Sequence, residues 1–113
     1  MSDGTKSDDG KLRLDLLPIE PLEEIAKVLT FGARKYGAWN WTKGFRWSRL
    51  IGACFRHLFA WVRGENIDPE TKLSHLAHAG CCILFLLWHE KHRKELDDRL
   101  SALLEPNLVR DPR

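Results

Sequence analysis

Hydrophobic side chains recur at helical spacing over most of this chain. In residues 18–36 and again in residues 47–63 they return every three or four positions, which places them on one face of a helix. Residues 73–92 predict a third helix that is apolar on nearly all sides between positions 76 and 88. A charged stretch with leucines at 90–104 predicts a fourth helix or a continuation of the third. No segment favours a strand, so the pattern predicts an all-α bundle of about four helices.

The two ends of the chain differ from its middle. Residues 1–16 are rich in serine, aspartate and glycine, so we expect a flexible tail. Its leucines could pack on the body or on a partner subunit: Leu12, Leu14, Leu16 and Leu17. The helical domain then covers residues 17–105, and a C-terminal tail covers 106–113. Because so short a chain cannot cover a helix that is apolar all round, we expect a homo-oligomer, either a dimer or a tetramer.

Composition narrows the class of protein. The chain has 113 residues, of which 43% are hydrophobic, as expected for one globular domain. Its formal net charge of +2 is too small to argue for binding along a nucleic acid. No secretory leader and no membrane-spanning run is visible, so we expect a cytoplasmic protein. The cysteines all lie in apolar segments and are expected to be buried thiols: Cys54, Cys81 and Cys82.

Histidines and carboxylates cluster around the turn between the second and third helices. His75 and His78 share one helix face, and His57 comes from the preceding helix. The turn itself supplies three acids: Glu65, Asp68 and Glu70. An antiparallel helix pair would bring these groups together, where imidazole and carboxylate suit Mn, Zn, Fe or Co, and carboxylates alone suit Mg. The alternative is that Asp68 caps the turn and the histidines form hydrogen bonds in the core.

Two further groups of residues could contact a phosphate-bearing ligand. The N-terminal half of the first helix either binds a metal or is simply solvated, and it contains Glu20, Glu23, Glu24 and Lys27. The end of that helix and the loop after it either bind phosphates and a base or close the end of the core. They contain Arg34, Lys35, Tyr36, Trp39, Asn40, Trp41 and Lys43. His89 and His92 lie among charged residues and are expected to be exposed.

Several ordered motifs together resemble one protein family. They are LEEIAKVLTFGARKYG at 22–37, NW at 40–41, RHLFAW at 56–61, RGE at 63–65, DPE at 68–70, HLAHA at 75–79 and LFLL at 84–87. Across about residues 11–90 the chain resembles the phage dATP/dGTP diphosphohydrolases, which are similar to the MazG-like all-α nucleotide pyrophosphatases. Typical MazG-like enzymes have Glu-Glu-x-x-Glu on one helix and Glu-x-x-Asp on the next. This chain has His57 and His75-x-x-His78 on the helix pair instead, so the ligands of the wider superfamily cannot be copied to it.

The resemblance implies hydrolysis of dGTP and dATP to a monophosphate and pyrophosphate, with Mg²⁺, Mn²⁺ or another divalent transition metal. In phages whose DNA carries 2-aminoadenine, such enzymes are known as MazZ. The candidate metal ligands are His57, Glu65, Asp68, His75 and His78. The candidate catalytic acids are Glu24, Glu65 and Asp68. The candidate substrate-binding residues are Lys27, Lys35, Tyr36, Trp39, Asn40, Trp41 and Arg63.

Two other classes of function stay open at this point. Five tryptophans interleaved with cations could belong to a nucleic-acid-binding or regulatory module without turnover, although the near-neutral charge disfavours a nucleic-acid partner. A structural zinc-binding oligomerisation domain would use the same histidines without hydrolysis. An HD-type phosphohydrolase is disfavoured because the chain contains no His-Asp dipeptide.

Overall fold

The computed structural model describes residues 4–104, and in this range the chain is helical without any strand. Four α-helices follow one another, namely α1 (Ile19–Tyr36), α2 (Trp47–Val62), α3 (His75–His92) and α4 (Leu100–Leu104). Short 3-10 turns cover Leu14–Leu16, Asn40–Lys43 and Lys94–Leu96. The all-α prediction is therefore confirmed for the described residues, whereas the expected tail at 106–113 lies outside them.

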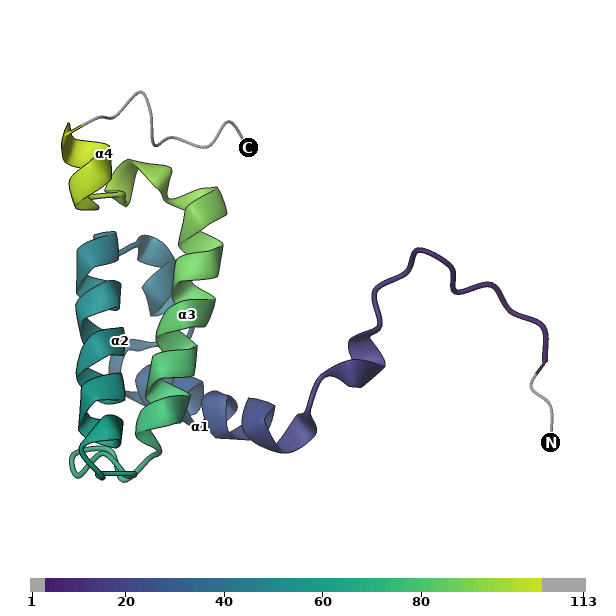
Figure 1. The fold of residues 1–113 in the computed structure, drawn as a ribbon, viewed down its shortest axis with the longest axis horizontal. Helices are drawn as coiled ribbons and strands as arrows, with labels where there is room; N and C mark the ends of the chain where they lie inside the picture. The colour runs from purple at the N-terminus through teal and green to yellow at the C-terminus, as the bar shows by residue number, and fades with distance from the viewer. Residues whose placement is uncertain (1–3, 105–113) are drawn as a thin grey trace.

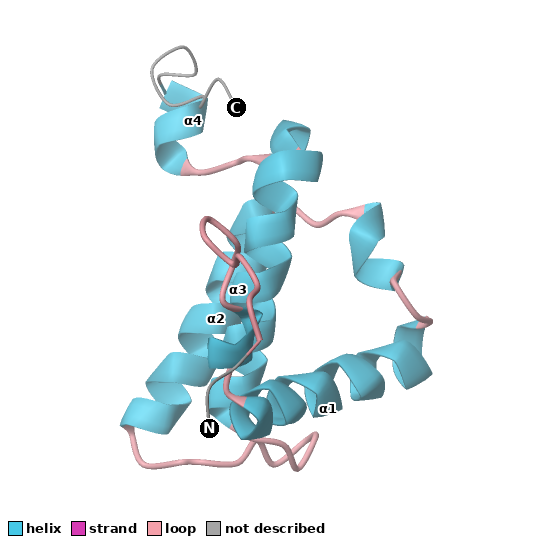
Figure 2. Cartoon of the chain, turned by 90° about the vertical axis from the view of Figure 1, so that its right-hand side faces the viewer, coloured by secondary structure: helices cyan, strands magenta, loops and turns pink. Residues whose placement is uncertain are grey.

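Helices α2 and α3 form an antiparallel pair, and α1 lies across the end of that pair where α3 begins (Figures 1 and 2). Small residues on α3 allow both neighbours to approach. Val28 of α1 packs against Ala77 and Cys81, and Cys54 of α2 packs against the other side of α3, at Ala79 and Cys82. Helix α3 is therefore the central element, which explains why its sequence is apolar on nearly all sides.

The three cysteines are buried free thiols, as expected from the sequence. Burial raises the pKa of Cys81 to about 12 and that of Cys82 to about 11, and it also raises the pKa of Cys54. Because only a thiolate is a strong nucleophile or metal ligand, these residues act as small core side chains.

The stretch at 90–104, predicted as a fourth helix or a continuation of the third, is broken in the structure. Helix α3 ends at His92, and α4 begins only at Leu100. Between them, Asp98 accepts hydrogen bonds from the backbone N–H and the hydroxyl of Ser48, at 2.8 and 2.5 Å. Since Ser48 lies in the first turn of α2, the Asp98 carboxylate caps that helix and binds the segment to it.

The loop between α1 and α2 is held against the C-terminal half of α3. The ring of Trp41 stacks on Phe85 at 4.4 Å, and the Arg93 guanidinium donates to the carbonyl of Thr42 at 3.0 and 3.2 Å. His89 is 0% exposed beneath this loop. The expectation that His89 is exposed was therefore wrong, because charged neighbours in sequence do not reveal that a distant loop covers the residue. His92, one turn further on, is exposed as expected.

Large apolar side chains stay exposed at several places, of which two bear on the predicted homo-oligomer. Residues 4–18 extend away from the helices (Figure 1), and their leucines are solvent-exposed. Helix α3 also exposes Ile83, Leu84 and Leu87. The homo-oligomer stays a prediction. Among the described residues, no helix is long and apolar enough to cross a membrane.

Candidate functional site

A cavity of about 500 Å³ lies where α1, the loop after it, the 68–71 turn and α3 meet. Its walls are largely apolar, with Val28 and Leu29 from α1 and Cys81 and Phe85 from α3. Polar side chains are confined to two parts of the lining. One part consists of His57, Asp68, Glu70, Thr71 and His78, and the other of Lys35, Tyr36, Trp39 and Asn40. An apolar cavity of this size with a few convergent polar groups is typical of a small-molecule site.

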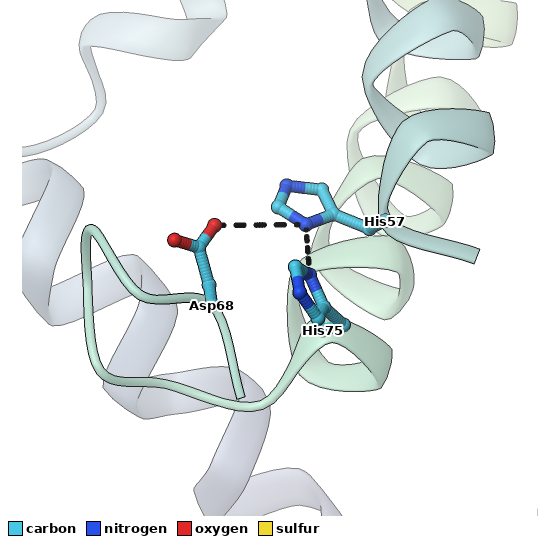
Figure 3. A group of neighbouring side chains, drawn as sticks. All are labelled: His57, Asp68 and His75. Carbon is cyan, nitrogen blue, oxygen red and sulfur yellow. Dashed lines mark hydrogen bonds and ion pairs between the residues drawn. The ribbon is translucent and has the colours of Figure 1, made fainter. Parts of the chain in front are cut away.

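Three side chains from separate elements converge beside the cavity (Figure 3). The Nδ1 atoms of His57 on α2 and His75 on α3 lie 2.9 Å apart. Oδ2 of Asp68, on the turn between these helices, lies 3.8 Å from Nδ1 of His57. One possible ligand atom of each residue lies within 4.8 Å of the other two. His57 and Asp68 line the cavity, whereas His75 is 5% exposed and lies behind its wall.

The turn aims the Asp68 carboxylate. Its Oδ1 accepts hydrogen bonds from the backbone N–H groups of Glu70 and Thr71, at 2.7 and 3.3 Å, which leaves Oδ2 towards His57. Burial by itself raises the pKa of Asp68, but these two N–H groups and the nearby histidines outweigh it, and the pKa is lowered. Asp68 is therefore an ionised carboxylate at neutral pH. Asp68 therefore caps the turn through Oδ1 and faces His57 through Oδ2, so the two alternatives drawn from the sequence hold together.

His78 extends the cluster into the cavity. Its ring stacks on His57 with centroids 4.4 Å apart and an interplanar angle of 6°. Its Nε2 lies 2.7 Å from the Thr71 hydroxyl. Burial lowers the pKa of both His57 and His78, and the neighbouring histidines add to this effect. Both rings are therefore neutral at pH 7, which is the form that binds a metal. Sequence reasoning missed Thr71, although a threonine in a short turn often bonds the local backbone, as the Thr71 hydroxyl does here by accepting from the N–H of Leu73.

The other end of the cavity is aromatic. Trp41 is enclosed by Phe85 and by Trp88, whose ring meets it edge-on at 5.1 Å. Trp39 is 71% exposed and lies 6.0 Å from Trp41. Trp41 thus forms the wall, and Trp39 has a face free to stack on a ligand. Asn40 and Tyr36 line the same end, together with Lys35.

Several residues predicted for the site lie away from this cavity. Lys27 forms an ion pair with Glu24 at 2.8 Å on the exposed surface of α1, and neither lines the cavity. Arg63 is exposed at the C-terminal end of α2 and does not line it either. Glu65 contacts the side of the His75 ring opposite His57, with its Oε1 2.6 Å from Nε2 of His75. Of the residues predicted for the site, only some therefore face the cavity, and the roles assigned to them stay predictions.

The cluster of His57, Asp68 and His75 fits a divalent metal ion. Two ligand atoms that bind one ion at about 2.1 Å lie roughly 3–4 Å apart, and the separations here are 2.9 and 3.8 Å. Two imidazoles with one carboxylate favour Mn, Fe, Co or Zn, whereas Mg²⁺ prefers an all-oxygen set. Because the rings are held by partners on several elements, the donors are arranged in advance of any ion.

This fold and site define a class of protein: an all-helical chain whose cavity joins a histidine–carboxylate cluster to an aromatic and cationic rim. Residues 1–99 match the family model described as "dATP/dGTP diphosphohydrolase, N-terminal", so the chain belongs to that family, as its motifs indicated. Over 110 residues the chain is 38% identical to a protein of Salmonella phage PMBT28 named dATP/dGTP diphosphohydrolase. The match covers 97% of this chain but only 37% of that relative's length. No solved structure matches the chain.

Proposed function

We propose that this chain is a metal-dependent diphosphohydrolase that converts dGTP and dATP to the monophosphate and pyrophosphate. The observation that carries the proposal is the opening of a histidine–carboxylate cluster into a cavity with an exposed tryptophan at its other end. Family membership and the printed name of the phage relative supply the substrate class. The role in phage metabolism of 2-aminoadenine DNA is part of the same proposal.

The two ends of the cavity suit the two ends of a nucleotide. At the aromatic end, Trp39 stacks on the purine and Asn40 forms hydrogen bonds with its edge. Lys35, which lines the cavity, neutralises part of the triphosphate charge. At the other end, His57, Asp68 and His75 hold the cation, either Mn²⁺ or a similar metal, or Mg²⁺ with additional water ligands.

The reaction adds water to the α-phosphorus and breaks the bond between this atom and the oxygen that leaves with pyrophosphate. A divalent cation, when bound, neutralises phosphate charge and makes water a better nucleophile. The chain's own residues position the reactants and take up the proton of the attacking water. Asp68 and Glu70 are the acids that line the cavity, and Glu70 is the better proton acceptor because Asp68 faces the cation.

The test is incubation of the purified chain with dGTP or dATP and Mn²⁺ or Mg²⁺, followed by anion-exchange separation of the products. We expect a deoxynucleoside monophosphate and pyrophosphate in equal amounts, with no reaction in the presence of a chelator. Asp68→Asn should lower kcat/KM by about 100-fold or more, because it removes a charge at the reacting centre. Glu20→Gln is the matched control, since this exposed acid of α1 does not line the cavity.

Three results would contradict the proposal. Release of inorganic triphosphate with a nucleoside would mean a different bond is broken. Stoichiometric Zn²⁺ binding that stabilises the fold without any turnover would favour the structural zinc domain. Equal activity of Asp68→Asn and Glu20→Gln would place the chemistry elsewhere in the chain.

A further inference from the structure

We propose that Glu65 is a positioning residue that fixes the ring of His75 from outside the metal site, and that it does not itself bind the metal. This inference rests on the proposed metal-dependent function. It separates Glu65 from Asp68, although both acids lie on the same turn and sequence spacing makes them equivalent candidates.

Glu65 and the metal cluster use opposite nitrogens of one imidazole. Oε1 of Glu65 lies 2.6 Å from Nε2 of His75, while Nδ1 of the same ring faces His57 at 2.9 Å. The two nitrogens of an imidazole point away from each other, so a carboxylate at Nε2 cannot share an ion held at Nδ1. Glu65 is also absent from the group whose donor atoms lie within 4.8 Å of one another, namely His57, Asp68 and His75.

The hydrogen-bonding pattern determines where the protons lie. An ionised carboxylate can only accept, so Nε2 of His75 carries a proton and donates it to Glu65. In the neutral ring, Nδ1 of His75 is then a lone-pair donor directed at His57 and the neighbouring Asp68. A carboxylate that accepts a hydrogen bond from Nε2 also makes Nδ1 a stronger electron-pair donor, which strengthens its bond to a metal. Glu65 thereby selects the tautomer of His75 whose Nδ1 can bind the metal.

The chain fixes Glu65 in place before any ion binds. Helix α2 ends in a Schellman motif, in which the N–H of Glu65 donates to the carbonyl of Ala60 and the N–H of Gly64 donates to that of Trp61. Gly64 has a φ of +103°, which a side chain would disfavour. The next residue, Asn66, accepts from the backbone N–H of His75 at 3.0 Å. The bond between Asn66 and His75 thus anchors the start of α3 near the end of α2, and the turn at Gly64 brings the Glu65 carboxylate to His75.

The experiment uses Co²⁺ as a probe, because its visible absorption bands depend on which ligands surround it. Co²⁺ is titrated into the wild-type chain and into Glu65→Gln, Glu65→Ala, Asp68→Asn and Glu20→Gln, after circular dichroism has verified that each variant is folded. Glu65→Ala should bind Co²⁺ about 10–100-fold more weakly than wild type, with unchanged band positions. Glu65→Gln should recover part of this loss, because its amide oxygen still accepts from Nε2. Asp68→Asn should shift the bands, and Glu20→Gln should match wild type.

The outcomes separate this inference from the proposed function. If Glu65→Gln shifts the bands as Asp68→Asn does, Glu65 is a ligand and the inference is overturned. Wild-type affinity in Glu65→Ala also overturns it. A chain that gives the expected Co²⁺ pattern but releases no pyrophosphate from dGTP or dATP upholds the role of Glu65 and overturns the proposed hydrolysis. Failure of the wild-type chain to bind Co²⁺ at all overturns both.

Discussion

Replacing His89 by leucine should loosen the loop that forms the aromatic end of the cavity. His89 is completely buried, and both of its ring nitrogens form hydrogen bonds. Nδ1–H donates to the carbonyl of Phe85 at 2.7 Å, and Nε2 accepts from the backbone N–H of Phe45 at 3.1 Å. Leucine fills much of the same space but has no acceptor, so the N–H of Phe45 would be left buried and unpaired.

The magnitude follows from these two bonds. An unpaired buried N–H costs about 1–3 kcal/mol, and the lost bond to Phe85 costs about 1 kcal/mol more. The second loss is the smaller one because the Phe85 carbonyl lies within helix α3, whose own hydrogen bonding satisfies it. The free energy of unfolding should therefore fall by about 2–4 kcal/mol, out of a total of roughly 5–15 kcal/mol for a domain of this kind.

The assay is urea unfolding followed by circular dichroism, combined with hydrogen exchange at the Phe45 amide. With a slope of about 2 kcal/mol per molar urea, His89→Leu should lower the midpoint by about 1–2 M. The matched control is His92→Leu, one turn further along α3 at an exposed position, which should change stability by less than about 0.5 kcal/mol. Because Trp39 and Asn40 belong to the same loop, His89→Leu should also raise KM for the nucleotide more than it lowers kcat.

The reasoning would be refuted if His89→Leu and His92→Leu unfolded at the same urea concentration while the Phe45 amide stayed protected. In that case the burial of His89 would be incidental, and the loop would be held by its other contacts, such as the stacking of Trp41 on Phe85.

Three further predictions concern other parts of the chain. Gly44→Ala should destabilise the fold by about 1–3 kcal/mol in urea unfolding, because φ is +101° and the new methyl would lie 2.6 Å from the Leu96 side chain; unchanged stability would contradict that packing. Lys35→Gln should raise KM for dGTP by about tenfold, whereas Lys27→Gln, which alters only an exposed ion pair, should leave it unchanged; similar values for both would remove Lys35 from the site. The free energy of unfolding should fall as pH drops below the ordinary histidine pKa of 6.5. The pKa values of His57 and His78 are lowered in the folded chain, so the unfolded chain binds a proton at each histidine first. Thermal melting between pH 8 and 5 tests this, and a flat profile would contradict it.

The helices could be predicted from the sequence because the cause of each is local. A stripe that recurs every three to four residues defines a helix face wherever the chain folds, and α1, α2 and α3 appear within one or two residues of the expected ranges. Boundaries follow local chemistry as well: Ser74 caps α3 by accepting from the N–H groups of Leu76 and Ala77. The motifs also identified the family, since several of them occur in a fixed order along the chain.

The predictions that were wrong share one physical reason. Contacts between residues far apart in the sequence outweigh the local residue pattern. Charged neighbours made His89 look exposed, yet a loop more than forty residues earlier covers it. The run at 90–104 has helical spacing, but α3 ends at His92 and α4 begins only at Leu100. Between them the Asp98 carboxylate accepts hydrogen bonds from Ser48 in the first turn of α2.

For the candidate site, the sequence determined which chemical groups were available, and the tertiary structure decided how they are used. Spacing placed His57, Asp68, His75 and Glu65 near one turn, because adjacent antiparallel helices must meet there. Only the packed structure shows that Asp68 faces the two Nδ1 atoms while Glu65 holds the opposite side of the His75 ring. Which side of an imidazole a carboxylate contacts depends on the Schellman turn at Gly64 and on the packing of α2 against α3. The packing cannot be predicted from any local residue pattern.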